Sequence, residues 1–528
     1  MVVSDQLNWE YISAMGNSYV KTTNIDRLCE TGVRFDRAYA INPVSIPSRI
    51  GMFTGARQLA MSAIYEKKFM YFKFWTYFVI VVFSICLLFG CSKETPINEH
   101  KDTDLKPSRV ELVQRDDQWQ LLRNDEPFYI HGVAAGASTY KEERPSCYYR
   151  MLADCGGNAI RTYGVNEDTK NVLDGAYTNG ITVALGLWVN KESQGFNYND
   201  PVAINSQLKA LQQQVRSFKN HPALLMWIVG NEVDAQYSTL TQKQQMWTAV
   251  NNIHKMIHEE DGNHPTTTAI INASREKLDD IKRWVPNMDI LSSNAKHQQV
   301  PGVLTNLQDA GWTKPYILSE YGPRGMTQLN PLAERILEWG GLVEQTSTEK
   351  EQDYLDVYQN HVIPNRNNGC LGSFAFVWGY QTNGAIATWY GTHNLEGLPF
   401  GVVNALQFCW TGQHPENRAP RIDSREDMLL NGKRAEDNIK ILQGSANKAS
   451  VIAIDPEGDA LEYNWMISPE RGTSPDGGPH PGLPRLIQTN GNSAVTFIAP
   501  TYGAYRLYVY VKDTKNNMAS AVIPFLVE

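Results

Sequence analysis

The sequence predicts an α/β fold, namely a (β/α)8 TIM barrel with a C-terminal immunoglobulin-like β-sandwich. From about Arg109 to Trp410, eight short apolar runs alternate with longer amphipathic stretches, as expected for repeated βα units. After Trp410 the pattern changes to period two, with turns rich in Gly, Pro and Asp, which is typical of a β-sandwich. With 528 residues and 42% hydrophobic residues, the chain is long enough for both domains.

Each apolar run has the length of a buried strand. The eight candidate strands are 128–136, 158–164, 182–189, 224–232, 266–271, 289–294, 316–322 and 372–380. Residues 204–219, 242–260 and 349–362 have apolar spacing near 3.6 residues, which suits an outer ring of helices. Because parallel strands of a barrel end at one rim, residues at the strand ends are the candidate functional residues.

Composition divides the chain into segments. The expected division is 1–60 (a fragment that does not fold alone), 61–91 (a signal segment), 92–108 (a tether), 109–412 (the barrel), 413–423 (a linker) and 424–528 (the β-sandwich). The net charge of −8 and the absence of long Lys or Arg blocks argue against a nucleic acid partner. No cysteine pair has the spacing of metal ligands, so the sequence predicts no metal site and no cofactor.

An almost continuously apolar run, 69–90, ends at Cys91. Its length would allow a transmembrane helix. Lysines precede it and a glycine lies directly before Cys91, so it also resembles a bacterial lipoprotein signal, which is cut before a cysteine that then carries the lipid. The second interpretation predicts lipidation at Cys91 and a lipid-anchored protein of the bacterial cell envelope.

The residues before this signal have a pattern of their own. Ser45-Ile46-Pro47-Ser48-Arg49 resembles the sulfatase signature for conversion of Cys or Ser to formylglycine, and residues 4–58 resemble the beginning of that family. The resemblance stops near residue 58, and a segment this short cannot bury enough surface to fold alone. We therefore interpret residues 1–60 as a truncated sulfatase fragment and assign no catalytic role to Ser45.

Two glutamates end apolar runs of the predicted barrel. Glu232 follows the fourth run and Glu320 lies in the seventh, so both should reach the same rim. A lone glutamate after a strand is usually a solvated loop residue or an ion-pair partner. Two carboxylates at one rim are what cleavage of a glycosidic bond requires.

The residues around these glutamates extend the argument. The order Ile160-Arg161-Thr162-Tyr163-Gly164, Gly230-Asn231-Glu232, Glu320-Tyr321-Gly322 and Trp378 resembles the clan A retaining glycoside hydrolases, most closely the family 2 barrel, with some similarity to β-1,3-glucan-active barrels. The jelly-roll and immunoglobulin-like domains that precede most family 2 barrels do not fit between Cys91 and the first strand. The resemblance implies that Glu232 is the general acid/base, that Glu320 is the nucleophile, and that configuration is retained.

The resemblance also implies supporting roles. Arg161 would supply a cation to the nucleophile, or neutralise a core carboxylate; Asn231 would bind the sugar hydroxyl beside the reacting carbon; Trp378 would offer a sugar platform, or pack in the barrel. Where many clan members bring a tyrosine or histidine after the sixth strand, this chain has Ser293-Asn294-Ala295-Lys296-His297. Weaker candidates for substrate contact are His297, His131, Tyr163, Trp188 and Tyr321.

The C-terminal module contains Asp455-Pro456-Glu457-Gly458-Asp459, followed by Leu461, Tyr463 and Trp465. This pattern resembles the polycystic-kidney-disease (PKD) or cadherin-like modules of secreted bacterial enzymes, which serve as spacers, sometimes touch polysaccharide and sometimes hold calcium. We expect a spacer, with Trp465 in its core.

Together these patterns predict an enzyme that hydrolyses β-linked oligo- or polysaccharides with retention, using two glutamates and no cofactor. The alternatives are a transglycosylase acting on β-glucan, a non-catalytic glycan-binding lipoprotein, and a sulfatase. The sequence specifies neither the sugar nor the oligomeric state.

Overall fold

The computed structural model describes residues 106–116, 118–135, 145–235, 239–325, 336–381, 388–394, 396–470 and 491–528. The sulfatase-like fragment, the apolar run and Cys91 lie outside the described residues, so the lipid anchor stays a prediction. Among the helices that the model describes, none is both long and apolar enough to cross a membrane.

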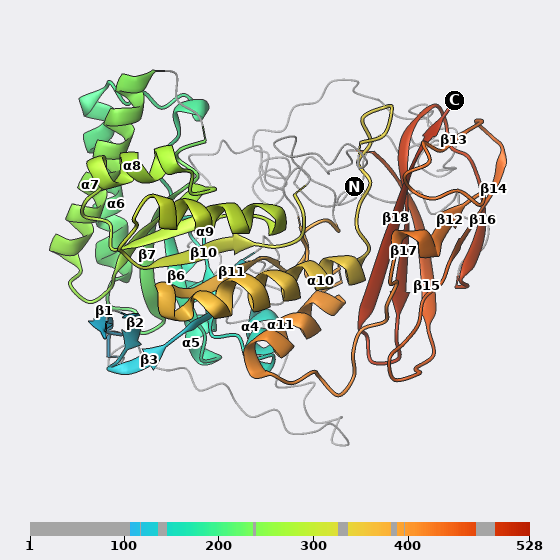
Figure 1. Cartoon of the computed structure of the whole chain (residues 1–528), viewed down its shortest axis with the longest axis horizontal. Coiled ribbons are helices and arrows are strands. Elements are labelled where there is room, and N and C mark those ends of the chain that lie inside the picture. The colour runs from blue at the N-terminus through green and yellow to red at the C-terminus, as the bar shows by residue number, and fades with distance from the viewer. Residues whose placement is uncertain are drawn as a thin grey trace, which may run out of the picture. The chain divides into compact units, whose positions relative to one another are not determined.

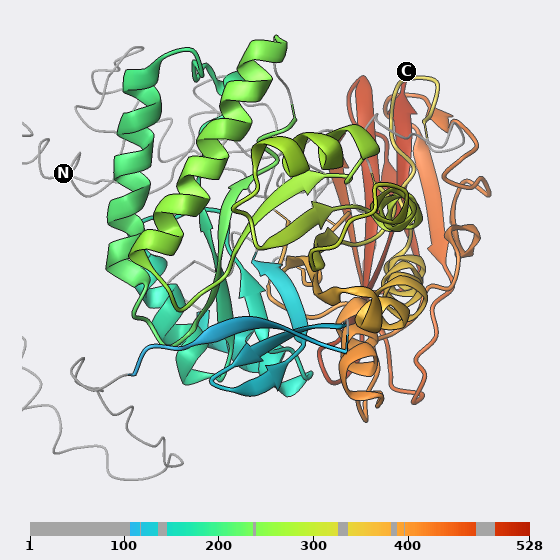
Figure 2. The ribbon, with the colours of Figure 1, turned by 60° about the vertical axis from the view of Figure 1, so that its left-hand side comes forward.

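Eight parallel strands close into a barrel (Figures 1 and 2). In barrel order they are β4 (Ile130–Ala135), β5 (Ala159–Arg161), β6 (Thr182–Leu187), β7 (Leu224–Asn231), β8 (Thr266–Ile271), β9 (Ile290–Asn294), β10 (Tyr316–Tyr321) and β11 (Cys370–Trp378). β11 pairs with β4 and closes the ring. Seven of the eight apolar runs contain one of these strands, and the eighth, 372–380, overlaps β11, so the predicted (β/α)8 barrel is confirmed.

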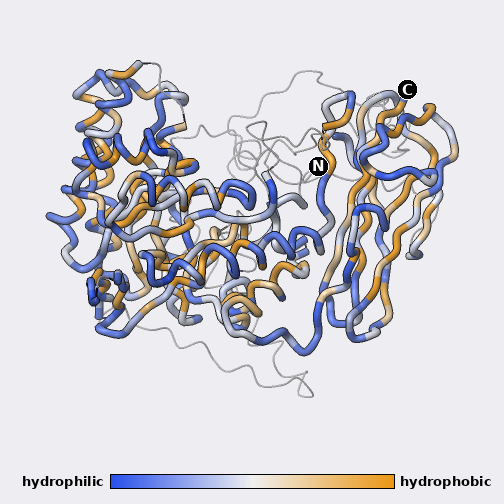
Figure 3. The backbone as a smooth tube through the Cα atoms, viewed as in Figure 1, coloured by the Kyte–Doolittle hydropathy of each residue, from blue (hydrophilic) through white to orange (hydrophobic). Residues whose placement is uncertain are grey.

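Helices surround the barrel. They are α4 (Pro145–Asp154), α5 (Thr169–Thr178), α6 (Pro201–Phe218), α7 (Leu240–Glu260), α8 (Arg275–Trp284), α9 (Val300–Asp309), α10 (Ser347–Val357) and α11 (Gly401–Thr411). Several start at side-chain caps: Asp200 accepts backbone hydrogen bonds at the start of α6, and Thr346 forms a capping box with Glu349 at α10, which satisfies N–H groups that lack partners in the first turn. Figure 3 shows their alternation of hydrophilic and hydrophobic residues around the hydrophobic strands.

A small antiparallel sheet that the sequence did not predict precedes the barrel. It consists of β1 (Val110–Arg115), β2 (Gln118–Arg123) and β3 (Glu126–Phe128). Val110 and Leu121 are buried and pack in one cluster with inward barrel residues such as Ile130. The sheet therefore covers the amino-terminal end of the barrel, opposite the rim at which the strands end.

A buried polar chain fastens the entering segment at this end. Ser108 Oγ lies 2.9 Å from His264 Nε2, His264 Nδ1 lies 2.8 Å from Asp261 Oδ2, and the same carboxylate oxygen accepts a 2.7 Å bond from the indole N–H of Trp227. The order of Ser, His and Asp resembles a hydrolase triad, but Ser108 is buried and lies 2.7 Å from the carbonyl oxygen of Leu224. The amino-terminal face of a TIM barrel serves stability rather than chemistry. We therefore assign a structural role to this chain of hydrogen bonds.

A second polar pair at this end makes stability depend on pH. His258 Nε2 lies 2.7 Å from Asp289 Oδ2. The hydrogen bond from Asp289 raises the pKa of His258. Burial alone would raise the pKa of Asp289, but the bonds with His258 and Thr266 outweigh it and lower that pKa.

The stabilisation by His258 is therefore fully present below its unfolded pKa of about 6.5 and is lost as pH rises through the folded value. The contribution of Asp289 is present above its unfolded pKa of about 3.9 and is lost as pH falls. We expect His258→Gln to destabilise the protein most between about pH 4 and about pH 6.5, with a smaller difference at higher pH. Urea unfolding of both proteins across pH measures this; a difference that grows above neutrality would contradict it.

The C-terminal region is a β-sandwich. One sheet contains β12 (Met428–Leu430), β14 (Ala446–Val451) and β16 (Ala494–Ile498), and the other contains β13 (Lys440–Ile441), β18 (Met518–Val527), β17 (Gly503–Lys512) and β15 (Glu462–Pro469). Trp465 is buried between them, as predicted. In the predicted linker, the Ala419 and Ile422 backbone N–H groups donate to Asn404 and Thr348 of the barrel helices, so this segment is packed.

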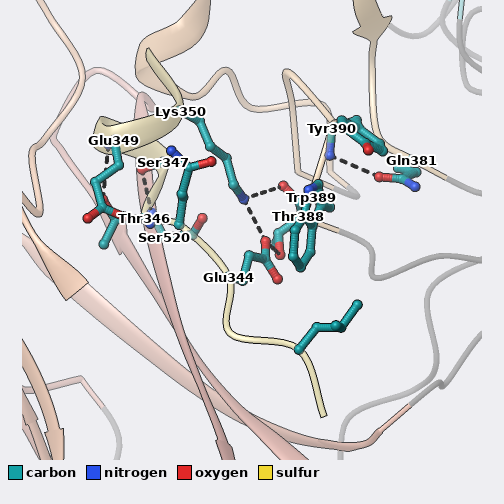
Figure 4. Close-up of polar contacts among 12 residues, drawn as sticks. Glu344, Thr346, Ser347, Glu349, Lys350, Gln381, Thr388, Trp389, Tyr390 and Ser520 are labelled. Carbon is teal, nitrogen blue, oxygen red and sulfur yellow. Dashed lines mark hydrogen bonds and ion pairs between the residues drawn. The ribbon is translucent and has the colours of Figure 1, made fainter. Parts of the chain in front are cut away.

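Buried charges join the sandwich to the barrel. Glu344, which is fully buried, accepts hydrogen bonds from Lys350 of α10 (2.5 Å), the Thr388 hydroxyl (2.6 Å) and Arg506 of β17 (3.3 Å). Figure 4 shows Lys350 directed at Glu344 and at the carbonyl oxygen of Thr388, 2.8 Å away. Ser520 of β18 also donates its N–H to Ser347. The sandwich therefore contributes to the same packed unit as the barrel.

Candidate active site

Glu232 follows β7 directly, at a bend in the backbone. Gly230 and Glu232 have φ values of +73° and +53°, and the second is in the left-handed region that residues with a side chain rarely adopt. The Glu232 N–H donates to the carbonyl oxygen of Ala269 (2.8 Å), which fixes the bend against β8. Strained backbone of this kind is concentrated at functional sites.

Glu320 is the second-last residue of β10, and only 6% of it is exposed. Its Oε1 atom accepts hydrogen bonds from Arg161 (3.2 Å) and from the Tyr163 hydroxyl (2.9 Å). Its Oε2 atom lies 3.3 Å from the Lys296 ammonium group. Among the described residues, the Glu320 carboxylate therefore has three donors, two of which are cations.

Asn294, the last residue of β9, connects the two glutamates. Its side-chain N–H group donates to Glu232 Oε1 (3.0 Å) and to Asn231 Oδ1 (3.0 Å). Its oxygen accepts from Arg161 (2.9 Å), which in turn contacts Glu320. The two carboxyl groups therefore belong to one hydrogen-bonded network at the rim.

Arg161 is the centre of this network. It is completely buried and its guanidinium donates to Glu320, Asn294, Asn231 and the carbonyl oxygen of Ser319. It also lies 4.8 Å from the centre of the Tyr163 ring. The planar fork of arginine suits several fixed acceptors at once, so Arg161 of β5 connects the ends of β7, β9 and β10.

Asn294 and Lys296 were not among the predicted site residues. Asn294 ends the sixth strand and Lys296 follows it, within the segment from which only His297 was chosen. Lys296 is two positions beyond Asn294. Side chains in a strand point alternately to its two sides, so residues two positions apart point to the same side. That alternation was the available signal.

The structure places the other predicted residues away from this network. Trp378 is buried, and its indole N–H donates to the carbonyl oxygen of Tyr148. His297 Nε2 lies 2.7 Å from Asp356 of α10. His131 stacks on Trp410 of α11, with centroids 6.1 Å apart. These contacts favour the packing alternative for Trp378 and give His131 and His297 structural partners.

The last two predicted contacts differ in exposure. Tyr321 is fully buried and packs edge to face against Tyr354, so its ring does not offer a face to a sugar. Trp188, just after β6, is 39% exposed and lies 5.4 Å from the Lys191 ammonium. Of the two, only Trp188 has a surface available for a ligand.

One group of carboxylates lies outside this site. Asp455, Asp459 and Asp513 of the sandwich have oxygen atoms within 4.8 Å of one another. The Asp513 oxygens already accept hydrogen bonds from Asn417 and from the backbone N–H groups of Lys515 and Asn517. Asp513 is buried and the other two aspartates are half-buried; because the Asp513 oxygens have these partners, we assign no ion here.

Most of the barrel matches a known family model. Residues 160–370 match the family model described as glycosyl hydrolases family 2, TIM barrel domain. Residues 1–71 match the sulfatase family model, as the signature at Ser45 suggested. Over 54 residues the chain is 37% identical to an N-acetylglucosamine-6-O-sulfatase of Bacteroides thetaiotaomicron, a match that covers 10% of each chain.

The barrel itself is similar to beta-glucuronidases. The enzyme of Sus scrofa is 27% identical over 228 residues, which are 38% of this chain and 32% of that enzyme. The chain thus spans at most about a third of the length of the first curated beta-glucuronidases that it matches. A solved structure of a calcium binding mutant of Bacteroides uniformis beta-glucuronidase 2 is 15% identical, with 79% of this chain and 48% of that chain covered and a TM-score of 0.45. Residues 160–370 of the barrel are therefore similar to the TIM barrel domain of glycosyl hydrolases family 2.

Proposed function

We propose that the chain is a retaining β-glycosidase in which Glu232 is the general acid/base and Glu320 is the nucleophile. The observation that carries this proposal is the network at the rim: Glu320 is held by Arg161, Tyr163 and Lys296, whereas Glu232, among the described residues, accepts a hydrogen bond from the neutral side chain of Asn294. The difference suits the two roles, because the nucleophile must be ionised and the acid must carry a proton.

The reaction would proceed in two displacements. Glu320 attacks the anomeric carbon while Glu232 donates its proton to the leaving oxygen, and a covalent glycosyl-enzyme forms. Glu232, now ionised, takes a proton from water, which attacks the same carbon and releases Glu320. Asn231, whose side-chain oxygen accepts hydrogen bonds from Arg161 and Asn294, would bind the hydroxyl next to the reacting carbon.

The similarity to beta-glucuronidases guides the choice of substrate. We propose a β-linked glycoside, with aryl β-glucuronides as the first probe and neutral aryl β-glycosides beside them. The envelope location that Cys91 predicts would give the enzyme access to glycans outside the cytoplasm.

The test is a panel of aryl β-glycosides with the purified full chain, followed by NMR of the first-formed product. We expect release of the aglycone and a sugar that first appears as the β-anomer. A first-formed α-anomer would overturn retention, and the absence of turnover with every glycoside would overturn the proposal in favour of a glycan-binding protein. Transfer to a sugar at high acceptor concentration would identify a transglycosylase.

A further inference from the structure

Glu320 has a second cation in addition to Arg161. Arg161 and Tyr163 both donate to Oε1, while Lys296 lies 3.3 Å from Oε2. Each carboxylate oxygen is therefore held from a different side, and Lys296 is the described cation that contacts the second oxygen.

The Lys296 ammonium is fixed by two aromatic rings. Its Nζ lies 3.8 Å from the centre of the Phe376 ring and 4.9 Å from that of Tyr390, which are favourable distances for a cation over a ring face. The Tyr390 N–H donates to Gln381, a bond that Figure 4 shows. Among the described residues, the carboxylate that forms an ion pair with this ammonium is that of Glu320.

On this geometry, and on the proposed function, we propose that Lys296 is a positioning residue that stabilises Glu320 as a carboxylate, both before its attack and when it leaves the glycosyl-enzyme. A neutral hydroxyl at this place could give a hydrogen bond, but an ammonium group adds a charge. The ammonium forms an ion pair with the free carboxylate of Glu320. It has no such partner in the glycosyl ester, in which Glu320 has no negative charge.

The charge therefore acts mainly on the second displacement. Water attacks the anomeric carbon, its proton passes to Glu232, and the bond between that carbon and the Glu320 oxygen breaks with its electron pair going to Glu320. A cation beside the departing oxygen stabilises the negative charge that develops there. Without it, the ester should persist for longer.

The groups that face Lys296 set its own ionisation. They are Glu320, Glu232, Arg161 and Tyr390. Burial lowers the pKa of Lys296, and the two glutamates oppose this effect. The role of Lys296 is thus lost at alkaline pH, when its ammonium loses a proton.

The test compares Lys296→Met, Lys296→Arg and, as a control, Lys243→Met. Lys243 of α7 also forms ion pairs with carboxylates, those of Glu276 and Asp280, but takes no part in the rim network. With an activated aryl glycoside, we expect Lys296→Met to lower kcat by about 10²-fold, to lower KM with it, and to show a burst of aglycone. We also expect the acidic limb of the pH–activity profile of Lys296→Met to move to higher pH.

Lys296→Arg keeps the charge, so it should keep the acidic limb even where its rate falls. Lys243→Met should match the wild type in all these properties. The inference is overturned if Lys296→Met shows neither burst nor shifted limb, or if Lys296→Arg, checked by circular dichroism, shifts the limb. A wild-type protein without turnover would instead overturn the proposed function itself.

Discussion

Glu320→Gln is expected to reduce kcat/KM by about 10⁴-fold or more, because the variant has no group that can form the glycosyl-enzyme. Glutamine keeps the size of the side chain and can keep a hydrogen bond from Tyr163, so the fold should be unchanged. Glu232→Gln should lose most activity toward substrates with poor leaving groups and less toward activated ones. Initial rates with both substrate types measure the difference.

Azide separates the two roles. In Glu232→Ala, azide can replace the activated water at the intermediate, so the expected product is the β-glycosyl azide. In Glu320→Ala, azide can fill the space of the nucleophile, so the expected product is the α-glycosyl azide. Glu276→Gln, whose side chain is 71% exposed, is the matched control and should keep wild-type rates. Identical azide products from both alanine variants would contradict the assignment.

Glu344→Ala is expected to lower the free energy of unfolding by about 3–5 kcal/mol, because it leaves the buried cations Lys350 and Arg506 without their shared carboxylate. Urea unfolding followed by circular dichroism measures the change. The control is Glu338→Ala, which removes an exposed partner of Lys440 and should have little effect, as is usual for surface pairs.

The same variant should also lower activity in the part of the population that stays folded. Thr388, which donates to Glu344, is two residues before Tyr390, whose ring packs on Lys296. The C-terminal sandwich thus reaches the rim through Arg506, Glu344 and Thr388. Equal stability of Glu344→Ala and Glu338→Ala would contradict this account and return the sandwich to the spacer that the sequence predicts.

The barrel could be predicted because its strands are buried on both sides. A run such as residues 224–231 is apolar almost throughout, and eight such runs between helices leave few other folds. The sheet β1 to β3 could not, because its strands mix exposed polar residues with few buried ones. Its stability comes from covering the barrel end, which no local pattern reports.

Those residues of the candidate site that lie at strand ends could be predicted from the sequence. Glu232, Glu320, Arg161, Asn231 and Tyr163 were named from that position, and the structure brings them together. Whether a side chain at a strand end faces the site or the surrounding helices depends on strand tilt and on neighbours distant in sequence. For this reason His131 and Trp378 were named although they pack against other elements, and Asn294 and Lys296 were missed.

The central claim is that Glu320 forms a bond to the sugar. A 2-deoxy-2-fluoro β-glycoside of the active substrate, with an activated aryl leaving group, tests it most directly. The fluorine slows both displacements and the leaving group speeds the first, so the intermediate accumulates. Peptide mass spectrometry of the labelled full chain should place the sugar on Glu320, with no label in Glu320→Gln. A label on Glu232, or on any other residue, would contradict the account.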